Sequence, residues 1–215
     1  MSDLKKSDEK YVDDPMVQSE KMFTEGCLLE NNAEFEKALS VFDQYRMFHP
    51  EDPKAYYELA CCHYALQNYD QALEYVNRAI NINYEYGEAV GLRGLIYLEK
   101  QEYEKSLPNL QFCNVVMPNE DMIIFGLLQA YIELGFIASA LICAKQLLVI
   151  KPLELRYQIY EALLYQRMGQ YDTAIELLEK VVANNPEEIE NLEMLNEIKG
   201  MKVENDVCRY PGMNN

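Results

Sequence analysis

Three consecutive residues, Cys61-Cys62-His63, are the ones whose types most readily suggest metal or redox chemistry. Cysteine thiolates and histidine imidazoles are preferred Zn²⁺ ligands, and a cysteine with a lowered pKa supports redox chemistry. Neighbouring residues of a helix point about 100° apart and do not face one another. If the segment is helical, these three side chains cannot easily bind one ion, so the type of backbone decides the interpretation.

Composition excludes several function classes. The chain has 215 residues, 36 of them acidic and 19 basic, with a net charge of -17. Phosphates and anionic lipids attract clustered lysine and arginine, so we expect no nucleic acid and no membrane surface as partner. The N-terminal stretch has no apolar run after its lysines, which argues against a secretory signal. The six cysteines are scattered, and we expect reduced thiols in a cytoplasmic protein.

A period of 34 residues runs along the chain. One set of small residues recurs at this interval, and a second set, mostly proline, follows each of them after twelve residues. The small set is Ala38, Ala72, Ser106, Ala140 and Ala174, and the second set is Pro50, Tyr84, Pro118, Pro152 and Pro186. A fixed period of this length is the signature of a repeat fold.

This pattern resembles the tetratricopeptide repeat, a helix-turn-helix unit with small and aromatic positions and a final proline. The match covers residues 19–186 without insertion or deletion, although Tyr84 replaces a proline and Leu128 replaces a small residue. The resemblance implies an all-α fold, a right-handed superhelical solenoid of helix-turn-helix repeats. The repeats are expected at about residues 19–52, 53–86, 87–120, 121–154 and 155–188, followed by a capping helix at about 187–200.

The solenoid should therefore span residues 14–201. Residues 1–13 are expected to form a disordered acidic arm and residues 202–215 a flexible tail, because both are polar. Pro108 falls inside the second helix of the third repeat, where it removes a hydrogen bond, and we expect a kink or a late start of that helix.

The repeat register also answers the question about Cys61-Cys62-His63. In this family Cys62 and His63 take positions usually filled by a buried alanine and a tyrosine, so we interpret both as packing residues. Cys61 faces the concave side and is the most reachable thiol. We expect no catalytic residue, no metal site and no cofactor, and therefore no enzyme.

In the tetratricopeptide family the first helix of each repeat lines a concave groove that holds a peptide. Here this groove is apolar and aromatic with an acidic entrance, which suits an amphipathic, basic segment of a partner protein. One subclass binds acidic tails through a lysine and an asparagine, and no repeat carries that pair. The candidate groove residues are Phe23, Cys27, Tyr57, Cys61, Tyr64, Leu92, Leu95, Phe125, Gln129, Ile132, Ile159, Tyr160 and Leu163.

A second surface is predicted on the convex side of repeats three and four. There Phe112, Val115, Ile142 and Val149 stand where the other repeats are mostly polar. Exposed apolar patches usually mark an interface, so we predict self-association or a second partner. The fourth repeat is very apolar, but charged residues interrupt it and the register continues through it, so we expect no membrane span.

The sequence thus predicts a non-catalytic protein-protein interaction module, an adaptor or assembly scaffold. The alternative is a holding chaperone for a hydrophobic client. Type III secretion translocator chaperones are similar, being small, acidic and built of repeats, and the magnetosome-associated scaffold family is similar in repeat number. No specific motif selects either. A chaperone keeps an insoluble partner in solution, whereas an adaptor binds a folded one.

Overall fold

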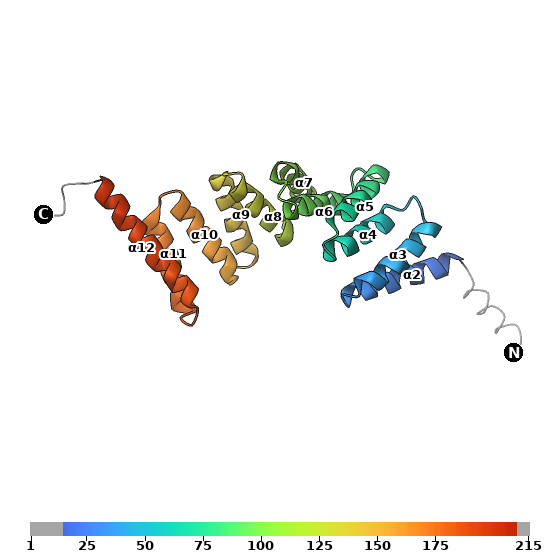
Figure 1. The fold of residues 1–215 in the computed structure, drawn as a ribbon, viewed down its shortest axis with the longest axis horizontal. Coiled ribbons are helices and arrows are strands. Elements are labelled where there is room, and N and C mark those ends of the chain that lie inside the picture. Colours follow the sequence, from blue (N-terminus) through green and yellow to red (C-terminus); the bar gives the residue numbers. More distant parts are fainter. Residues whose placement is uncertain (1–14, 210–215) are drawn as a thin grey trace, which may run out of the picture. The chain divides into compact units, whose positions relative to one another are not determined.

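The computed structural model of the protein describes residues 15–209, with side chains over residues 16–205 (Figure 1). The predicted acidic arm at residues 1–13 lies outside this range. Within it, every element is an α-helix, which confirms the all-α prediction. The helices are α2 (Pro15–Asn31), α3 (Phe35–Phe48), α4 (Pro53–Ala65), α5 (Tyr69–Ile82), α6 (Gly87–Glu99), α7 (Tyr103–Val116), α8 (Asp121–Glu133), α9 (Ile137–Ile150), α10 (Leu155–Arg167), α11 (Tyr171–Asn184) and α12 (Ile189–Arg209).

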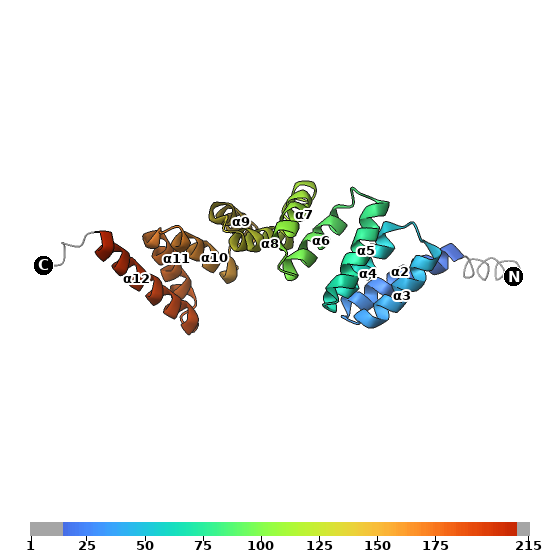
Figure 2. The same ribbon diagram turned by 45° about the horizontal axis from the view of Figure 1, so that its top comes forward.

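The helices form pairs that repeat along the chain. The first helices α4, α6, α8 and α10 begin 34 residues apart, and so do the second helices α3, α5, α7, α9 and α11. The two helices of each pair pack against each other and lie side by side in both views (Figures 1 and 2). This is the helical repeat fold that the period of the sequence predicts.

Small residues allow the paired helices to approach closely. Ala72 and Ala140, like the other members of the small set, are fully buried. A Cβ atom added to Gly94 would lie 2.8 Å from the side chain of Leu110 on the partner helix. The hydroxyl of Ser106 also donates a hydrogen bond of 2.7 Å to the carbonyl of Gly94. Bulky side chains at these positions would therefore push the two helices of a pair apart.

The turn inside each repeat has the same backbone conformation. One residue per turn has φ between 58° and 77°, in the left-handed region, and these residues are again 34 apart in sequence: Ala33, Gln67, Gln101, Gly135 and Gly169. Glycine adopts this conformation freely, whereas other L-residues pay a steric cost. The fold therefore imposes the same turn conformation on five different sequences, and three of them have no glycine at this position.

The chain divides into two compact units, Met1–Val116 and Met117–Asn215. The first unit contains α2 to α7, hence three repeats, with a core that includes Phe42, Leu59 and Ile96. The second contains α8 to α12, and its core includes Leu178 and Leu195, the latter from α12. The single solenoid over residues 14–201 stays a prediction.

The structure differs from two expectations about helix ends, the late start at Pro108 and the end of the last helix, while a kink at Pro108 stays a prediction. Helix α7 begins at Tyr103, at the same point of the repeat as its equivalents, so Pro108 does not delay its start. The last helix does not end at residue 200. It continues to Arg209, so most of the segment predicted as a flexible tail is helical. In the part of the chain that the structure describes, no helix combines the length and the apolar character needed to span a bilayer.

Candidate functional site

The residues of the Cys61-Cys62-His63 stretch point into three different environments. Cys62 is fully buried in the core of the first unit. The ring of His63 stacks on Tyr75 of α5, with centroids 5.3 Å apart and the planes at 9°. Cys61 lies half-buried on a third side. The three side chains do not form a common ligand set, as the helical geometry of α4 requires.

His63 and Cys62 behave as packing residues. Burial lowers the pKa of His63, although the carboxylate of Glu74 acts in the opposite direction, so the ring is neutral near pH 7. Burial also raises the pKa of Cys62 to about 12, with the nearby charges of Glu30 and Glu58 adding to the effect. A thiol must ionise to act as nucleophile or metal ligand, so Cys62 is unsuited to either role.

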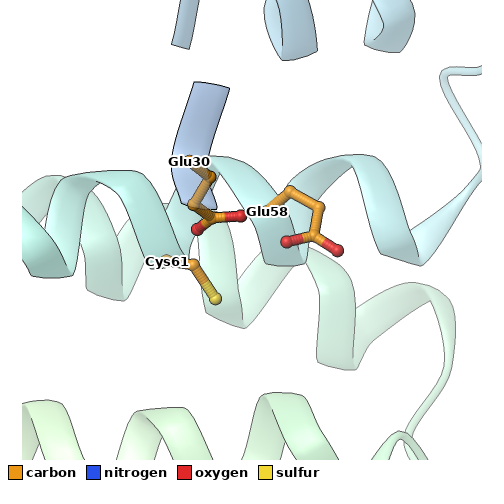
Figure 3. Close-up of side chains that lie close together, drawn as sticks. All are labelled: Glu30, Glu58 and Cys61. Carbon is orange, nitrogen blue, oxygen red and sulfur yellow. The ribbon is translucent and has the colours of Figure 1, made fainter. Parts of the chain in front are cut away.

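The fold brings together three side chains that the sequence analysis did not combine. Glu30 comes from the end of α2, and Glu58 and Cys61 come from α4 (Figure 3). Their carboxylate oxygens and thiol sulfur lie within 4.8 Å of one another. We call these three residues the acidic cluster. Part of the signal was present in the sequence, since Cys61 is a predicted groove residue, but its distance from Glu30 and Glu58 depends on how repeats stack.

The two carboxylates of the acidic cluster share a proton. Burial raises the pKa of Glu58, and the charge of Glu30 and a hydrogen bond with it raise this pKa further, to about 7, against a small opposing effect of Lys54. Burial likewise raises the pKa of Glu30, while the hydrogen bond from Glu58 lowers it. Two carboxyl groups this close cannot easily both be ionised, so they titrate as a coupled pair.

The thiol of the acidic cluster is protonated at neutral pH. Burial raises the pKa of Cys61 well above its ordinary value, and the charge of Glu58 adds to this effect. The pKa of Cys27 nearby is raised for the same two reasons, burial first. The aromatic neighbours Tyr57 and Tyr86 also have raised pKa values, mainly through burial. Cys61 therefore lacks the thiolate that reactivity needs, and its position on the concave side stays a prediction.

The acidic cluster can receive a cation in two ways. Glu30, Glu58 and Cys61 offer three donor atoms of types that Zn²⁺ accepts, yet a metal would have to deprotonate a thiol whose pKa is raised. A lysine ammonium or arginine guanidinium needs the two carboxylates alone, and it would form charge-assisted hydrogen bonds with them. The protonation of the cluster favours the organic cation over the metal.

The other predicted groove residues of the first unit differ in accessibility. Phe23, Tyr57 and Tyr64 are half-buried and pack against aromatic neighbours, Tyr57 on Tyr86 at 5.2 Å between centroids. Leu92 and Leu95 are only 7 % and 8 % exposed, so they belong largely to the core of α6. Tyr57 and Tyr64 thus lie on the same helix, α4, as two members of the acidic cluster. Leu92 and Leu95 are too buried to offer a partner much surface.

In the second unit one predicted groove residue, Phe125, packs against an arginine. The guanidinium of Arg156 lies 4.6 Å from the ring centroid of Phe125 and 5.0 Å from that of Tyr157. Tyr160 packs edge-on against Phe125, with 5.7 Å between centroids. The remaining predicted residues are half-buried on α8 and α10: Gln129, Ile132, Ile159 and Leu163.

The four residues of the predicted convex patch are all exposed. Phe112 and Val115 of the first unit have exposed fractions of 40 % and 79 %. Ile142 and Val149 of the second unit have 61 % and 84 %. The two pairs belong to different units, so their union in one patch stays a prediction.

Comparison with known proteins agrees with the repeat register. Two family models described as tetratricopeptide repeat match residues 30–96 and 158–187. No curated protein sequence matches the chain. Among solved structures, YrrB, described as a TPR protein with an unusual peptide-binding site, superposes with a TM-score of 0.72 at 18 % identity, over 86 % of this chain and 96 % of its own.

Two further structures support the same fold. MamA from Desulfovibrio magneticus RS-1 has a TM-score of 0.71 and 17 % identity, over 79 % of this chain and 96 % of that one. The protein TTC0263 from Thermus thermophilus, described as a thermophilic TPR protein, has a TM-score of 0.58 and 21 % identity, over 84 % of this chain and 98 % of that one. Likeness at these identities concerns the fold. The two matched segments are tetratricopeptide repeats, and the 34-residue helix register continues the same helical repeat fold between them.

Proposed function

We propose that the protein is a non-catalytic adaptor or assembly scaffold that binds a segment of a partner protein along its first helices. The segment is amphipathic, and one of its lysine or arginine side chains lies between Glu30 and Glu58. The acidic cluster carries this proposal, because two half-buried carboxylates lie beside half-buried aromatic residues, and no described cation is paired to them. Among residues 15–209, no lysine or arginine forms an ion pair with either carboxylate.

The physical reason is the cost of burying like charges. Burial and the charge of Glu30 favour a proton on the pair, and Lys54 offsets them only in part, as the raised pKa of Glu58 indicates. A partner's ammonium or guanidinium would replace that proton and gain short, charge-assisted hydrogen bonds. Tyr57 and Tyr64 flank the site on α4 and would contact the apolar side of the segment. The peptide-binding site for which YrrB is described supports peptide binding by a protein of this fold.

A crosslinking experiment tests the binding surface. The photoreactive residue benzoylphenylalanine replaces Tyr64 in one variant and the exposed Glu176 of α11 in another, and both are irradiated in extract of the source cells. We expect crosslinks from position 64 to a protein segment that contains lysine or arginine, identified by mass spectrometry. Capture of the same partner only from position 176 would contradict the proposed surface.

A charge variant then tests the anchor. Glu30→Gln/Glu58→Gln should weaken binding of the captured segment at least tenfold, whereas Glu85→Gln/Glu88→Gln, an equal charge change at two exposed positions, should not. Unchanged affinity of the first variant would refute the carboxylate anchor. A partner that remains soluble only while bound would assign the alternative role of a holding chaperone.

A further inference from the structure

Arg93 of α6 is held rigidly by two asparagines. Its Nε–H donates to Oδ1 of Asn109 on α7 at 2.8 Å, and Nη1 donates to Oδ1 of Asn77 on α5 at 3.1 Å. The amide of Asn109 is itself fixed, since its Nδ2 donates to the carbonyl of Lys105 at 2.6 Å. The guanidinium therefore has one defined position between α5 and α7, with the N–H groups of Nη2 left for another acceptor.

Within the described part of the chain this guanidinium has no acidic partner, which is unexpected in so acidic a chain. No glutamate or aspartate among residues 15–209 forms an ion pair with Arg93, although the chain has 36 acidic residues and 19 basic ones. An arginine cannot lose its proton to avoid the cost of burial. A half-buried, uncompensated cation of this kind attracts an anion from outside the molecule.

The same arginine lines a cavity of about 370 Å³ in the first unit. The other walls are mainly apolar, with Ile80 from α5, Val90 from α6, and Pro108 and Phe112 from α7. Tyr84, in the turn before α6, also lines it. Ligand pockets are typically apolar with a few placed polar groups, and their volumes begin at about 300 Å³.

Three of the residues that line the cavity differ in type from their equivalents in the other repeats. Two of them belong to the third repeat, and one lies in the turn before it. Arg93 stands where the equivalent residues are Glu25, Leu59, Leu127 and Glu161. Phe112 stands where they are Gln44, Arg78, Gln146 and Lys180, and Tyr84 stands where the other four repeats have proline. The repeat framework requires none of these substitutions. Their meeting in one cavity indicates a role outside the framework.

We propose that this cavity binds the C-terminal residue of a second partner protein, with an apolar side chain between Phe112 and Ile80 and the terminal carboxylate on Arg93. A carboxylate and the planar guanidinium form paired, charge-assisted hydrogen bonds. A C-terminal residue carries the carboxylate and the apolar side chain on one Cα, so a cavity of this size accommodates both. An internal acidic residue would need a separate neighbour to occupy the apolar walls.

Model peptides test the proposal by nuclear magnetic resonance on the full-length, ¹⁵N-labelled chain. The probe is an N-acetylated Gly-Ser-Gly-Ser-Phe peptide with a free C-terminal carboxylate. It should shift the amide signals of the residues around Arg93 and Phe112. The C-terminal amide of the same peptide should bind at least tenfold more weakly. A third peptide, which ends in Phe-Asp-amide, carries the acid on a side chain and should also bind more weakly.

Two variants test separately the part of the cavity that binds the carboxylate and the part that binds the apolar side chain. Arg93→Met should remove the preference for the free carboxylate, and Arg167→Met, an equal charge change at an exposed position of the second unit, should preserve it. Because Arg93 also joins α5 to α7, Phe112→Ser serves as the second variant. Phe112 is 40 % exposed and lies outside the hydrogen-bonded clamp, so the variant should keep its circular dichroism and lose binding of the phenylalanine peptide.

These experiments can fail independently of those that test the proposed function. Glu30→Gln/Glu58→Gln should bind the free-carboxylate peptide as the wild type does, because it changes the other surface. Equal affinity for the acid and the amide, shifts confined to other residues, or no shift at millimolar peptide would each overturn the cavity's assignment.

Discussion

Two surfaces of the first unit have opposite electrostatics on one repeat framework. On the first-helix side, Glu30 and Glu58 lie close together without an ion-paired cation among the described residues. Between the second helices α5 and α7, Arg93 lies without an acidic partner in the same part of the chain. The helices, the turns and the small buried residues are equivalent in both places. The framework thus fixes the backbone, and a few non-framework residues decide what each surface can bind.

The two surfaces also compensate for burial by different means. The carboxylate pair retains a proton, so its charge depends on pH. The guanidinium of Arg93 is instead satisfied by two asparagine oxygens. The charge of the Glu30–Glu58 surface therefore changes with pH, whereas the Arg93 surface offers a cation in a fixed position.

The largest expected effect concerns the pH dependence of stability. The pKa of Glu58 is raised from 4.5 to about 7, so the folded state holds a proton that the unfolded state releases. The stability that this proton provides is fully present below pH 4.5 and is lost as pH rises to about 7. Glu58→Gln should abolish this loss and be about 2–3 kcal/mol more stable than the wild type at pH 8.

Urea unfolding from pH 4 to pH 8, followed by circular dichroism, measures this effect. Glu88→Gln, an exposed glutamate of α6, is the control and should follow the wild type. Parallel curves for the wild type and Glu58→Gln would mean that the carboxylate pair is solvated and that the two surfaces do not differ in this way.

The next effect concerns the framework that both surfaces share. Ala72 and Ala140 are fully buried between paired helices, and leucine at either position would overpack the contact and cost about 1–3 kcal/mol. Hydrogen exchange should accelerate around α4 and α5 in Ala72→Leu, and around α8 and α9 in Ala140→Leu. An unchanged melting temperature in both variants would show that the register of the repeats is wrong.

The smallest effect concerns the turns that join first and second helices. Gln101 has φ 58°, in the left-handed region, so Gln101→Gly should relieve steric cost and stabilise the protein by about 0.5–1 kcal/mol. The reverse change, Gly169→Ala, should destabilise it by about 1 kcal/mol. A Cβ at Gly169 meets no atom within 4 Å, so the change in stability of this variant reports the cost of the backbone conformation and no steric clash. Effects of the same sign in the two variants would contradict a common turn conformation.

The sequence by itself determined the helical repeat, because a helix pair of constant length must return a small residue to the same contact every 34 positions. Ala72 and Ala140 could be placed in the core from this period alone, and both are fully buried. The period also showed that Cys61, Cys62 and His63 belong to one helix and cannot face one ion. These conclusions need local geometry and no knowledge of long-range packing.

The tertiary structure decided which side chains of different repeats meet. The proximity of Glu30 to Glu58, and of Arg93 to Asn77 and Asn109, follows from the stacking of helices distant in sequence. The turn conformation at Ala33, Gln67 and Gln101 was likewise invisible, because these residues do not favour it. Periodicity specifies the position of a residue within its repeat, whereas distances across repeats and the resulting pKa shifts depend on packing and burial, which only the folded chain creates.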